Sequence, residues 1–311
     1  MVRETKSVRS AYGKTLVALG KENKNVVVLD ADLSCSTQTK LFAKEFPERF
    51  FNVGIAEQDL VTTACGLACT GKIPFLSTFA VFASGRAWEQ IRNTVCYSNL
   101  NVKVVATHGG ITVGEDGASH QALEDISLMR SIPNMTVIVP ADETETIQAV
   151  KFAAEHVGPV YVRVARSNLV DVFDENYKFD YKKAYVMKEG SEVTLISNGE
   201  TLVETLDCAK ILQANGISAE VINVPVVKPL DSETIIKSAK KTGRVFTIEN
   251  HSVIGGLGSA VCETLSENCP TKVTRIGTND EFGQSGTSEQ LLDYYGLTSE
   301  KLAQKIMGLI K

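Results

Sequence analysis

The chain has 311 residues, a formal net charge of −5 and 43% hydrophobic residues, which predicts about two domains of the usual roughly 100–200 residues. Its charges are dispersed without a basic stripe, so we expect no nucleic-acid partner. No apolar run approaches the roughly 20 residues of a membrane span, and the N-terminus lacks the apolar core of a signal peptide, so we expect a cytoplasmic protein with no membrane association.

The first part of the chain alternates short β-branched runs with longer helical patterns. The run Val26–Leu29 is uniformly apolar, which is typical of a parallel strand that is buried on both faces. Further strands are predicted at residues 50–53, 73–77, 102–107, 136–139 and 160–163, with helices at 83–97 and 143–155. This alternation predicts a mostly parallel sheet with helical crossovers over residues 1–168.

Residues 169–189 form a polar stretch rich in Asp, Lys and Tyr, which we interpret as a linker. A second alternation follows it, with strands predicted at residues 193–197, 219–224, 244–249 and 272–276 and helices at 202–215, 232–241 and 258–267. The predicted fold class is therefore α/β, with two doubly wound, mostly parallel domains, the smaller one spanning residues 190–311.

Glu57 follows the predicted strand 50–53 and opens a helix. An acid in the first turn of a helix complements the helix dipole, and this structural explanation is the default. The alternative is a buried acid directed at a ligand, because the ends of strands are the usual ligand sites of open α/β sheets. Gly54 favours this alternative, since glycine lets a backbone approach other groups closely.

Phe79 and Phe82 come off the next predicted strand, at the same edge of the sheet as Glu57. Phenylalanines three apart at the start of a helix are usually core residues. Their expected nearness to an acid makes stacking on a heterocycle the alternative function.

The loop at residues 107–121 contains His108 and His120, two of the chain's four histidines, together with several glycines. Imidazoles bind hydroxyls or phosphate, or carry protons, near neutral pH. A flexible, solvated loop is the plain alternative. A histidine metal site is disfavoured, because no further ligand spacing accompanies the two imidazoles.

Smaller signals surround these segments. Asp32 and Ser36 follow the first predicted strand, where Ser36 or Ser34 suits the N-cap of a helix that begins at Thr37. Arg9 and Arg166 are surface charges unless a neighbouring site makes them anion ligands. The sequence lacks the motifs of a phosphate-binding loop, a dinucleotide-binding site and a nucleophile elbow. We interpret Gly255–Gly258 as a tight turn between a strand and a helix. The seven cysteines form no Cys-x-x-Cys pair, which fits neither a disulfide framework nor a zinc ribbon.

These segments, in this order, resemble the C-terminal half of transketolases in the form that is encoded as a separate subunit. The resemblance extends from Arg9 to the last strand and includes residues 107–121 and 249–258. It implies a pyrimidine-binding domain of thiamine-diphosphate enzymes, followed by a transketolase C-terminal domain.

The resemblance also implies roles for individual residues. Glu57 matches the glutamate that hydrogen-bonds a ring nitrogen of the cofactor's aminopyrimidine and favours the imino tautomer that takes the thiazolium proton. Phe79 and Phe82 match the aromatic residues around the pyrimidine. The other matches are Asp32 near the cofactor, Ser36 near the sugar phosphate, His108, Asp116 and His120 at substrate hydroxyls or phosphate, and Arg9 and Arg166 at phosphate. The expected catalytic residues are Glu57, His108 and His120.

The chain departs from the family pattern at three places. Gly85 stands where many transketolases have a tyrosine, and Gly109-Gly110 stands where long-chain forms tend to have Asp-Ser. The Gly-Asp-Gly motif that anchors magnesium and diphosphate in the family is missing. The resemblance therefore implies that a separate N-terminal subunit supplies the Mg²⁺ and diphosphate site, within a heterotetramer.

The expected activity is transfer of a two-carbon ketol unit between sugar phosphates, with thiamine diphosphate and Mg²⁺ as cofactors. The β subunit of a 2-oxo acid dehydrogenase decarboxylase and a deoxyxylulose-phosphate synthase-like enzyme are alternatives that share the glutamate. The paired histidines and arginines favour transketolase. A non-catalytic partner module is the third alternative, and the presence of Glu57 argues against it.

Overall fold

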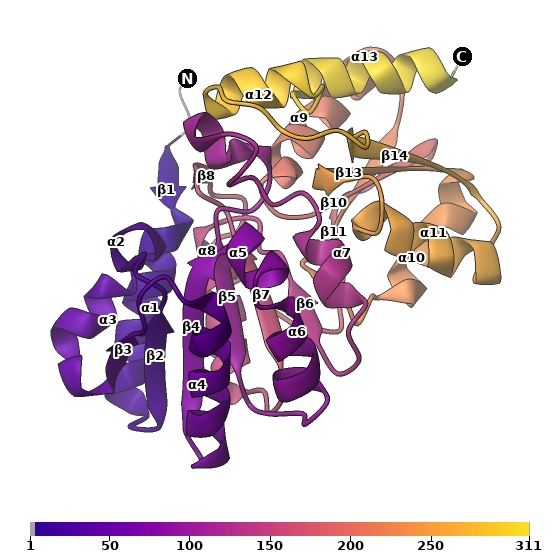
Figure 1. Cartoon of the computed structure of the whole chain (residues 1–311). Helices are drawn as coiled ribbons and strands as arrows, with labels where there is room; N and C mark the ends of the chain where they lie inside the picture. The colour runs from indigo at the N-terminus through magenta and orange to yellow at the C-terminus, as the bar shows by residue number, and fades with distance from the viewer. Residues whose placement is uncertain (1–3, 311) are drawn as a thin grey trace.

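The computed structural model describes residues 4–310 and arranges them around two large β-sheets that lie side by side (Figure 1). The terminal residues 1–3 and 311, which the predicted domains include, lie outside the described residues. The indigo and magenta half of the chain forms the first sheet, and the orange and yellow half forms most of the second (Figure 1).

The elements of the first half alternate as the sequence predicts. They are β1 (Thr5–Ser7), α1 (Val8–Glu22), β2 (Val26–Asp30), α2 (Ser34–Thr37), α3 (Lys40–Glu45), η1 (Pro47–Arg49), β3 (Phe50–Asn52), α4 (Glu57–Cys69), β4 (Ile73–Phe79), α5 (Ala80–Gly85), α6 (Trp88–Gln90), η2 (Ile91–Cys96), β5 (Lys103–Thr107), η3 (Ile111–Asp116), α7 (Asp125–Arg130), β6 (Thr136–Ile138), α8 (Glu143–Glu155) and β7 (Val160–Val164). The short elements η1 and η3 are 3₁₀-helices, and η2 is a π-helix.

The second half continues the alternation. Its elements are β8 (Asn168–Val170), β9 (Tyr185–Lys188), β10 (Val193–Ser197), α9 (Thr201–Ala214), β11 (Ala219–Asn223), β12 (Val226–Lys228), α10 (Ser232–Thr242), β13 (Arg244–Ser252), α11 (Leu257–Asn268), β14 (Lys272–Thr278), α12 (Ser288–Tyr294) and α13 (Ser299–Ile310). None of the helices in residues 4–310 is long and apolar enough to cross a membrane.

The first sheet has the strand order β12-β6-β7-β5-β4-β2-β3, and all of its strands from the first half of the chain are parallel. Apolar residues of α4, α5 and α7 pack on one face, and those of α1, α3 and α8 pack on the other. Both faces are therefore buried, which explains why β2 and β5 are buried along their whole length.

The second sheet has the order β14-β13-β10-β11-β9 and is parallel except for β9. Helices α9 and α13 cover one face, while α10 and α11 cover the other. Two mostly parallel α/β domains with helices on both faces confirm the predicted fold class.

Three features differ from the sequence-based expectation. The stretch predicted as a linker contains β8, which pairs with β1, and β9, which forms the edge of the second sheet. The helix predicted at 83–97 is divided into α5, α6 and η2. In addition, β12 leaves the second half of the chain and pairs antiparallel with β6, so the first sheet includes a strand from the second half.

Candidate active site

The candidate site lies where four neighbouring parallel strands, β5, β4, β2 and β3, reach their carboxyl ends. The strands run in one direction, so the segments that follow them emerge at the same edge of the sheet. These segments carry Glu57 after β3, Phe79 at the end of β4 and His108 after β5. The sheet order thus brings together groups that are far apart in the sequence.

Glu57 is the first residue of α4, and only 5% of it is exposed. Its Oε1 accepts a hydrogen bond from Nη1 of Arg86 at 2.9 Å. Both residues line a pocket of about 460 Å³ together with Ile55 and Gln58. The preceding Gly54 has a φ of 75° but open space around it, so its glycine character serves the turn rather than a close contact.

Two phenylalanines and two imidazoles form one cluster, which Arg86 links to this carboxyl group. The Phe79 ring stacks on His108 with 3.8 Å between ring centroids, and it lies 5.8 Å from Phe82. His120 meets Phe82 edge-on at 5.4 Å. The structure therefore gathers the four ring residues that the sequence singles out, whereas a solvated loop would leave the two imidazoles apart.

His108 is held in a buried environment. It is 3% exposed, it has a φ of 63°, and its Nδ1 is 2.8 Å from the hydroxyl of Thr107. Burial, reinforced by the nearby positive charges of Arg9 and Arg166, lowers the pKa of His108 to about 3. The imidazole is consequently neutral near pH 7 and suited to hydrogen bonding rather than to charge pairing.

Arg9 and Arg166 lie next to each other on the same side as His108. Nε of Arg9 donates to the backbone oxygen of Arg166 at 3.1 Å, and its Nη1 donates to the backbone oxygen of Ser36 at 2.8 Å. Burial and the charge of Arg166 lower the pKa of Arg9. Arg166 also pairs with Glu115 at 3.3 Å. Two adjacent guanidinium groups create a positive region that can hold an anion.

Asp32 and Asp116 have exposed side chains. Asp32 has a φ of 63° and accepts a hydrogen bond from Asn52 at 3.0 Å. The segment around it is anchored by its buried neighbour Asp30, which accepts from Thr37 at 2.7 Å and from the Leu33 amide at 2.6 Å. Burial raises the pKa of Asp30.

The loop that carries His108 and His120 is fixed by the second half of the chain, which the sequence did not indicate. Asn250, in β13, accepts from the Ile111 amide at 2.9 Å and donates to the Thr112 hydroxyl at 3.2 Å and to Glu200. A Cβ on Gly110 would come within 2.4 Å of Asn250. The glycine at 110 is thus required by the close approach of this asparagine.

Further contacts hold the same loop. A Cβ on Gly109 would lie 2.4 Å from the Arg163 guanidinium, which itself binds Asp125 at 2.9 Å and the Asn250 backbone oxygen at 2.9 Å. Gln121 donates to the backbone oxygens of Ile111 at 3.0 Å and of Gln284 at 2.9 Å. The departure from the family pattern at Gly109-Gly110 therefore has a packing explanation in this chain.

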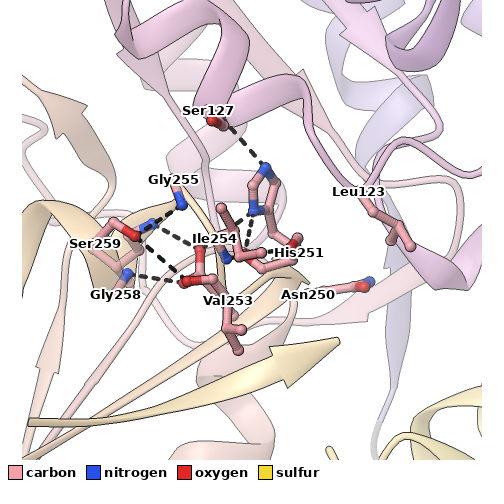
Figure 2. A network of polar contacts seen from close by, with 12 residues as sticks. Leu123, Ser127, Asn250, His251, Val253, Ile254, Gly255, Gly258 and Ser259 are labelled. Carbon is pink, nitrogen blue, oxygen red and sulfur yellow. Dashed lines mark hydrogen bonds and ion pairs between the residues drawn. The ribbon is translucent and has the colours of Figure 1, made fainter. Parts of the chain in front are cut away.

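Beside Asn250, a buried polar network joins the two halves (Figure 2). His251 Nδ1 donates to the Ser252 backbone oxygen at 2.7 Å, and its Nε2 accepts from the Ser127 amide at 3.4 Å. Glu249 accepts from the amides of Leu257 and Gly258 at the start of α11, at 2.7 and 2.8 Å. Burial raises the pKa of Glu249, and the network fixes the strand that presents Asn250.

Arg86 is the other residue that the sequence interpretation missed. Its Cζ lies 4.2 Å from the centroid of the Phe82 ring. The spacing of four residues places both side chains on one face of a helix, so the sequence did contain this signal. Among residues 4–310, no group of three or more His, Cys, Asp or Glu side chains is arranged to hold a metal ion.

Two family profiles match the chain. The profile "Transketolase, pyrimidine binding domain" matches residues 4–171, and "Transketolase, C-terminal domain" matches residues 182–302. A Methanocaldococcus jannaschii protein, provisionally named a transketolase C-terminal section, is 53% identical over 309 residues, covering 98% of this chain and 97% of the relative.

Two further relatives carry the names of different sugars. The 6-deoxy-6-sulfo-D-fructose transketolase subunit of a Clostridium species is 42% identical and covers 96% of this chain and 92% of its own. One of the subunits of the apulose-4-phosphate transketolase of Phocaeicola vulgatus is 38% identical, with 97% of each chain covered. A solved structure described as a split gene transketolase, in an inactive β4 tetramer, is 53% identical, with a TM-score of 0.91 and 98% coverage of both chains.

Proposed function

The chain belongs to the transketolase family as a C-terminal subunit of the split form, and on that premise we propose that it transfers a two-carbon ketol unit between sugar phosphates. Membership of the family implies dependence on thiamine diphosphate. When bound, this cofactor supplies the electron sink for cleavage and formation of the carbon–carbon bond.

The observation that carries the proposal is the position of Glu57. A carboxyl group that is buried at the first turn of a helix, and that Arg86 links to the Phe82 ring, fits an aminopyrimidine that needs one hydrogen bond at a ring nitrogen and an aromatic face. In this role Glu57 holds the proton at the ring nitrogen and Phe82 orients the ring. Phe79 and Asp32 complete the cofactor side of the site.

The opposite side of the site is suited to a sugar phosphate. A neutral His108 and the adjacent His120 bind substrate hydroxyls, and Asp116 contributes a further acceptor at the end of η3. Arg9 and Arg166 hold the terminal phosphate with the segment around Ser36. The names of the relatives include a sulfonated sugar and a sugar phosphate, so the anionic end of the substrate is the feature that this side must recognise.

The magnesium and diphosphate half of the site is assigned to another polypeptide. The sequence lacks the family's Gly-Asp-Gly motif, and residues 4–310 contain no metal-binding cluster. We infer a separate N-terminal subunit, joined to this chain in a heterotetramer in the cytoplasm. The solved structure of a related split transketolase is described as inactive when it is a β4 tetramer, which agrees with the need for a second type of subunit.

The test is co-purification of the chain with the products of neighbouring genes, followed by an assay with thiamine diphosphate and magnesium. We expect xylulose 5-phosphate and ribose 5-phosphate to be converted by the complex and not by this chain alone. Turnover of pyruvate alone would instead favour a 2-oxo acid decarboxylase. Absence of any turnover in a complex that contains the bound cofactor would favour the non-catalytic module.

A further inference from the structure

Arg86 contacts both of the groups that we assign to the aminopyrimidine. Its Nη1 is 2.9 Å from Oε1 of Glu57, and its Cζ lies over the Phe82 ring at 4.2 Å from the centroid. Phe79 packs nearly parallel to Phe82, and His120 meets it edge-on. Arg86 is therefore the group that joins the carboxyl group to the aromatic ring.

A guanidinium shares the recognition chemistry of an aminopyrimidine. Both are planar, carry N–H donors at their edge and stack on aromatic rings. Arginine has only donors, so Glu57 must act as a hydrogen-bond acceptor while Arg86 is bound to it. In the proposed role, the pyrimidine ring nitrogen binds the same carboxyl group of Glu57 and the pyrimidine stacks on the same Phe82 ring, so the two ligands compete.

We propose that Arg86 occupies the aminopyrimidine subsite of the isolated chain as an internal competitor, and that it leaves when the cofactor binds. This inference rests on the proposed function, because that function defines the subsite. In this role Arg86 controls the affinity of the chain for the cofactor. The resemblance to transketolases assigns no role to Arg86.

The surroundings of Arg86 allow the movement. Its side chain is 53% exposed, and its backbone oxygen is held by the Gln58 side chain at 3.2 Å, so the side chain can turn while the backbone stays in place. The adjacent Gly85 has no atom within 4 Å of the position of a Cβ, which leaves open space beside Arg86. The displaced guanidinium can therefore extend toward solvent or toward the partner subunit.

The experiment measures the binding of thiamine, which lacks the diphosphate that the partner is expected to hold. Isothermal titration calorimetry on the full-length chain compares the wild type with Arg86→Ala. Trp88 is the only tryptophan of the chain and lies two residues from Arg86, so its fluorescence gives a second readout. Removal of one half-exposed ion pair and one cation–π contact should tighten thiamine binding about tenfold.

Three variants make the result specific. Arg92→Ala removes a nearby exposed arginine that contacts Asn93, and it should leave binding unchanged. Arg86→Met keeps a long unbranched side chain and should also tighten binding, which guards against loss of folding in the alanine variant. Glu57→Ala should weaken thiamine binding in the Arg86→Ala background.

The outcomes separate the hypothesis that Arg86 is a competitor from the hypothesis that Glu57 belongs to a cofactor site. Unchanged or weaker binding by both Arg86 variants, with weaker binding by Glu57→Ala, would overturn the competitor and leave the cofactor site in place. Equal binding with and without Glu57 would remove the cofactor site, and with it the proposed function. Undetectable binding by every variant at millimolar thiamine would also overturn the competitor, because removal of Arg86 must expose the subsite.

Discussion

The two sides of the candidate site are built in different ways. The histidine side consists of the buried His108 on the loop at residues 107–121. Asn250 of the second domain accepts a hydrogen bond from the Ile111 amide of this loop, and Arg163 of the first domain packs closely against its Gly109. The carboxyl side, with Glu57, is held by one ion pair to an exposed arginine. The first is fixed by the packing of this chain, and the second is open at its surface.

This difference separates the tasks of the two sides. A buried network of satisfied hydrogen bonds is costly to rearrange, so the histidine side is preorganised for its ligand. The ion pair joins the buried carboxyl group of Glu57 to a guanidinium that is open to solvent, so the carboxyl side can exchange Arg86 for a ligand that offers the carboxyl group another hydrogen bond. We infer that the substrate side forms within the chain, whereas the cofactor side is completed by the cofactor and the second subunit.

The largest expected effect is on the carboxyl side. Glu57→Gln removes the group that we propose holds the proton at the pyrimidine ring, so transfer in the assembled complex should fall about 10²–10⁴-fold. Assembly with the partner should persist, as measured by size-exclusion chromatography. Glu155→Gln is the control, because Glu155 is an exposed acid at the C-terminal end of α8 and does not line the pocket of Glu57. Near-normal turnover by the Glu57 variant would contradict the mechanism.

The second effect tests whether the histidine side depends on the second domain. Asn250→Ala leaves the Ile111 amide without its acceptor, which should cost about 1–3 kcal/mol in the free energy of unfolding. Hydrogen exchange at Ile111 should accelerate, and the KM for the sugar phosphates should rise. Thiamine binding should not change, because the carboxyl side makes no contact with Asn250.

Asn268→Ala serves as the control for this variant, since Asn268 is exposed and bonds only within α11. Equal exchange rates at Ile111 in both asparagine variants would mean that the loop holds its shape without the second domain. The histidine side would then not depend on the second domain for its rigidity, and it would no longer differ from the carboxyl side in this respect.

The third effect comes from burial of the neutral imidazole. The pKa of His108 is lowered to about 3 from an ordinary value of about 6.5, so between these pH values the unfolded chain binds a proton that the folded chain does not. Stability should therefore decrease as the pH falls from about 6.5 toward 3, by up to about 1.4 kcal/mol per pH unit.

Urea unfolding of wild type and His108→Asn across this pH range measures the effect, since the difference cancels the contributions of the other histidines. The wild type should lose more stability than the variant on acidification. Parallel curves would mean that His108 is not buried in the neutral form, and the histidine side would then be less rigid than the structure indicates.

The fold was largely predictable from the sequence because both sheets are parallel. Strands such as Val26–Asp30 are buried on both faces and appear as uninterrupted apolar runs. The helix predicted at 83–97 was wrong as one continuous helix, since Gly85 and the π-helical turn Ile91–Cys96 divide it. Strand β12 was missed because its pairing with β6 depends on a contact between distant parts of the chain.

The candidate site residues could be predicted where a polar side chain follows an apolar strand. Glu57 and His108 have this signal, because the end of a strand limits where their side chains can lie. Asn250 does not, since it lies inside β13 and its importance arises only when the loop at Gly110 packs against it. Long-range packing of this kind leaves no local pattern in a single sequence.

The smallest expected effect concerns the pair of Arg166 and Glu115, which lies at the exposed rim of the histidine side. Glu115 lies 3.3 Å from Arg166, and the two side chains are 65% and 34% exposed. Exposed ion pairs are worth about 0.2–1 kcal/mol, so Glu115→Gln should free Arg166 and tighten binding of inorganic phosphate by about 1.4- to 5-fold.

Calorimetry at low and high salt measures this change, with Glu267→Gln on α11 as the control for loss of one negative charge. The gain should diminish as salt rises, because the screening length falls from about 10 Å at 0.1 M to about 3 Å at 1 M. Weaker phosphate binding by the Glu115 variant would mean that Glu115 orients Arg166 for the anion. In that case even the exposed rim of the histidine side would be preorganised, and the contrast with the carboxyl side would extend to its surface.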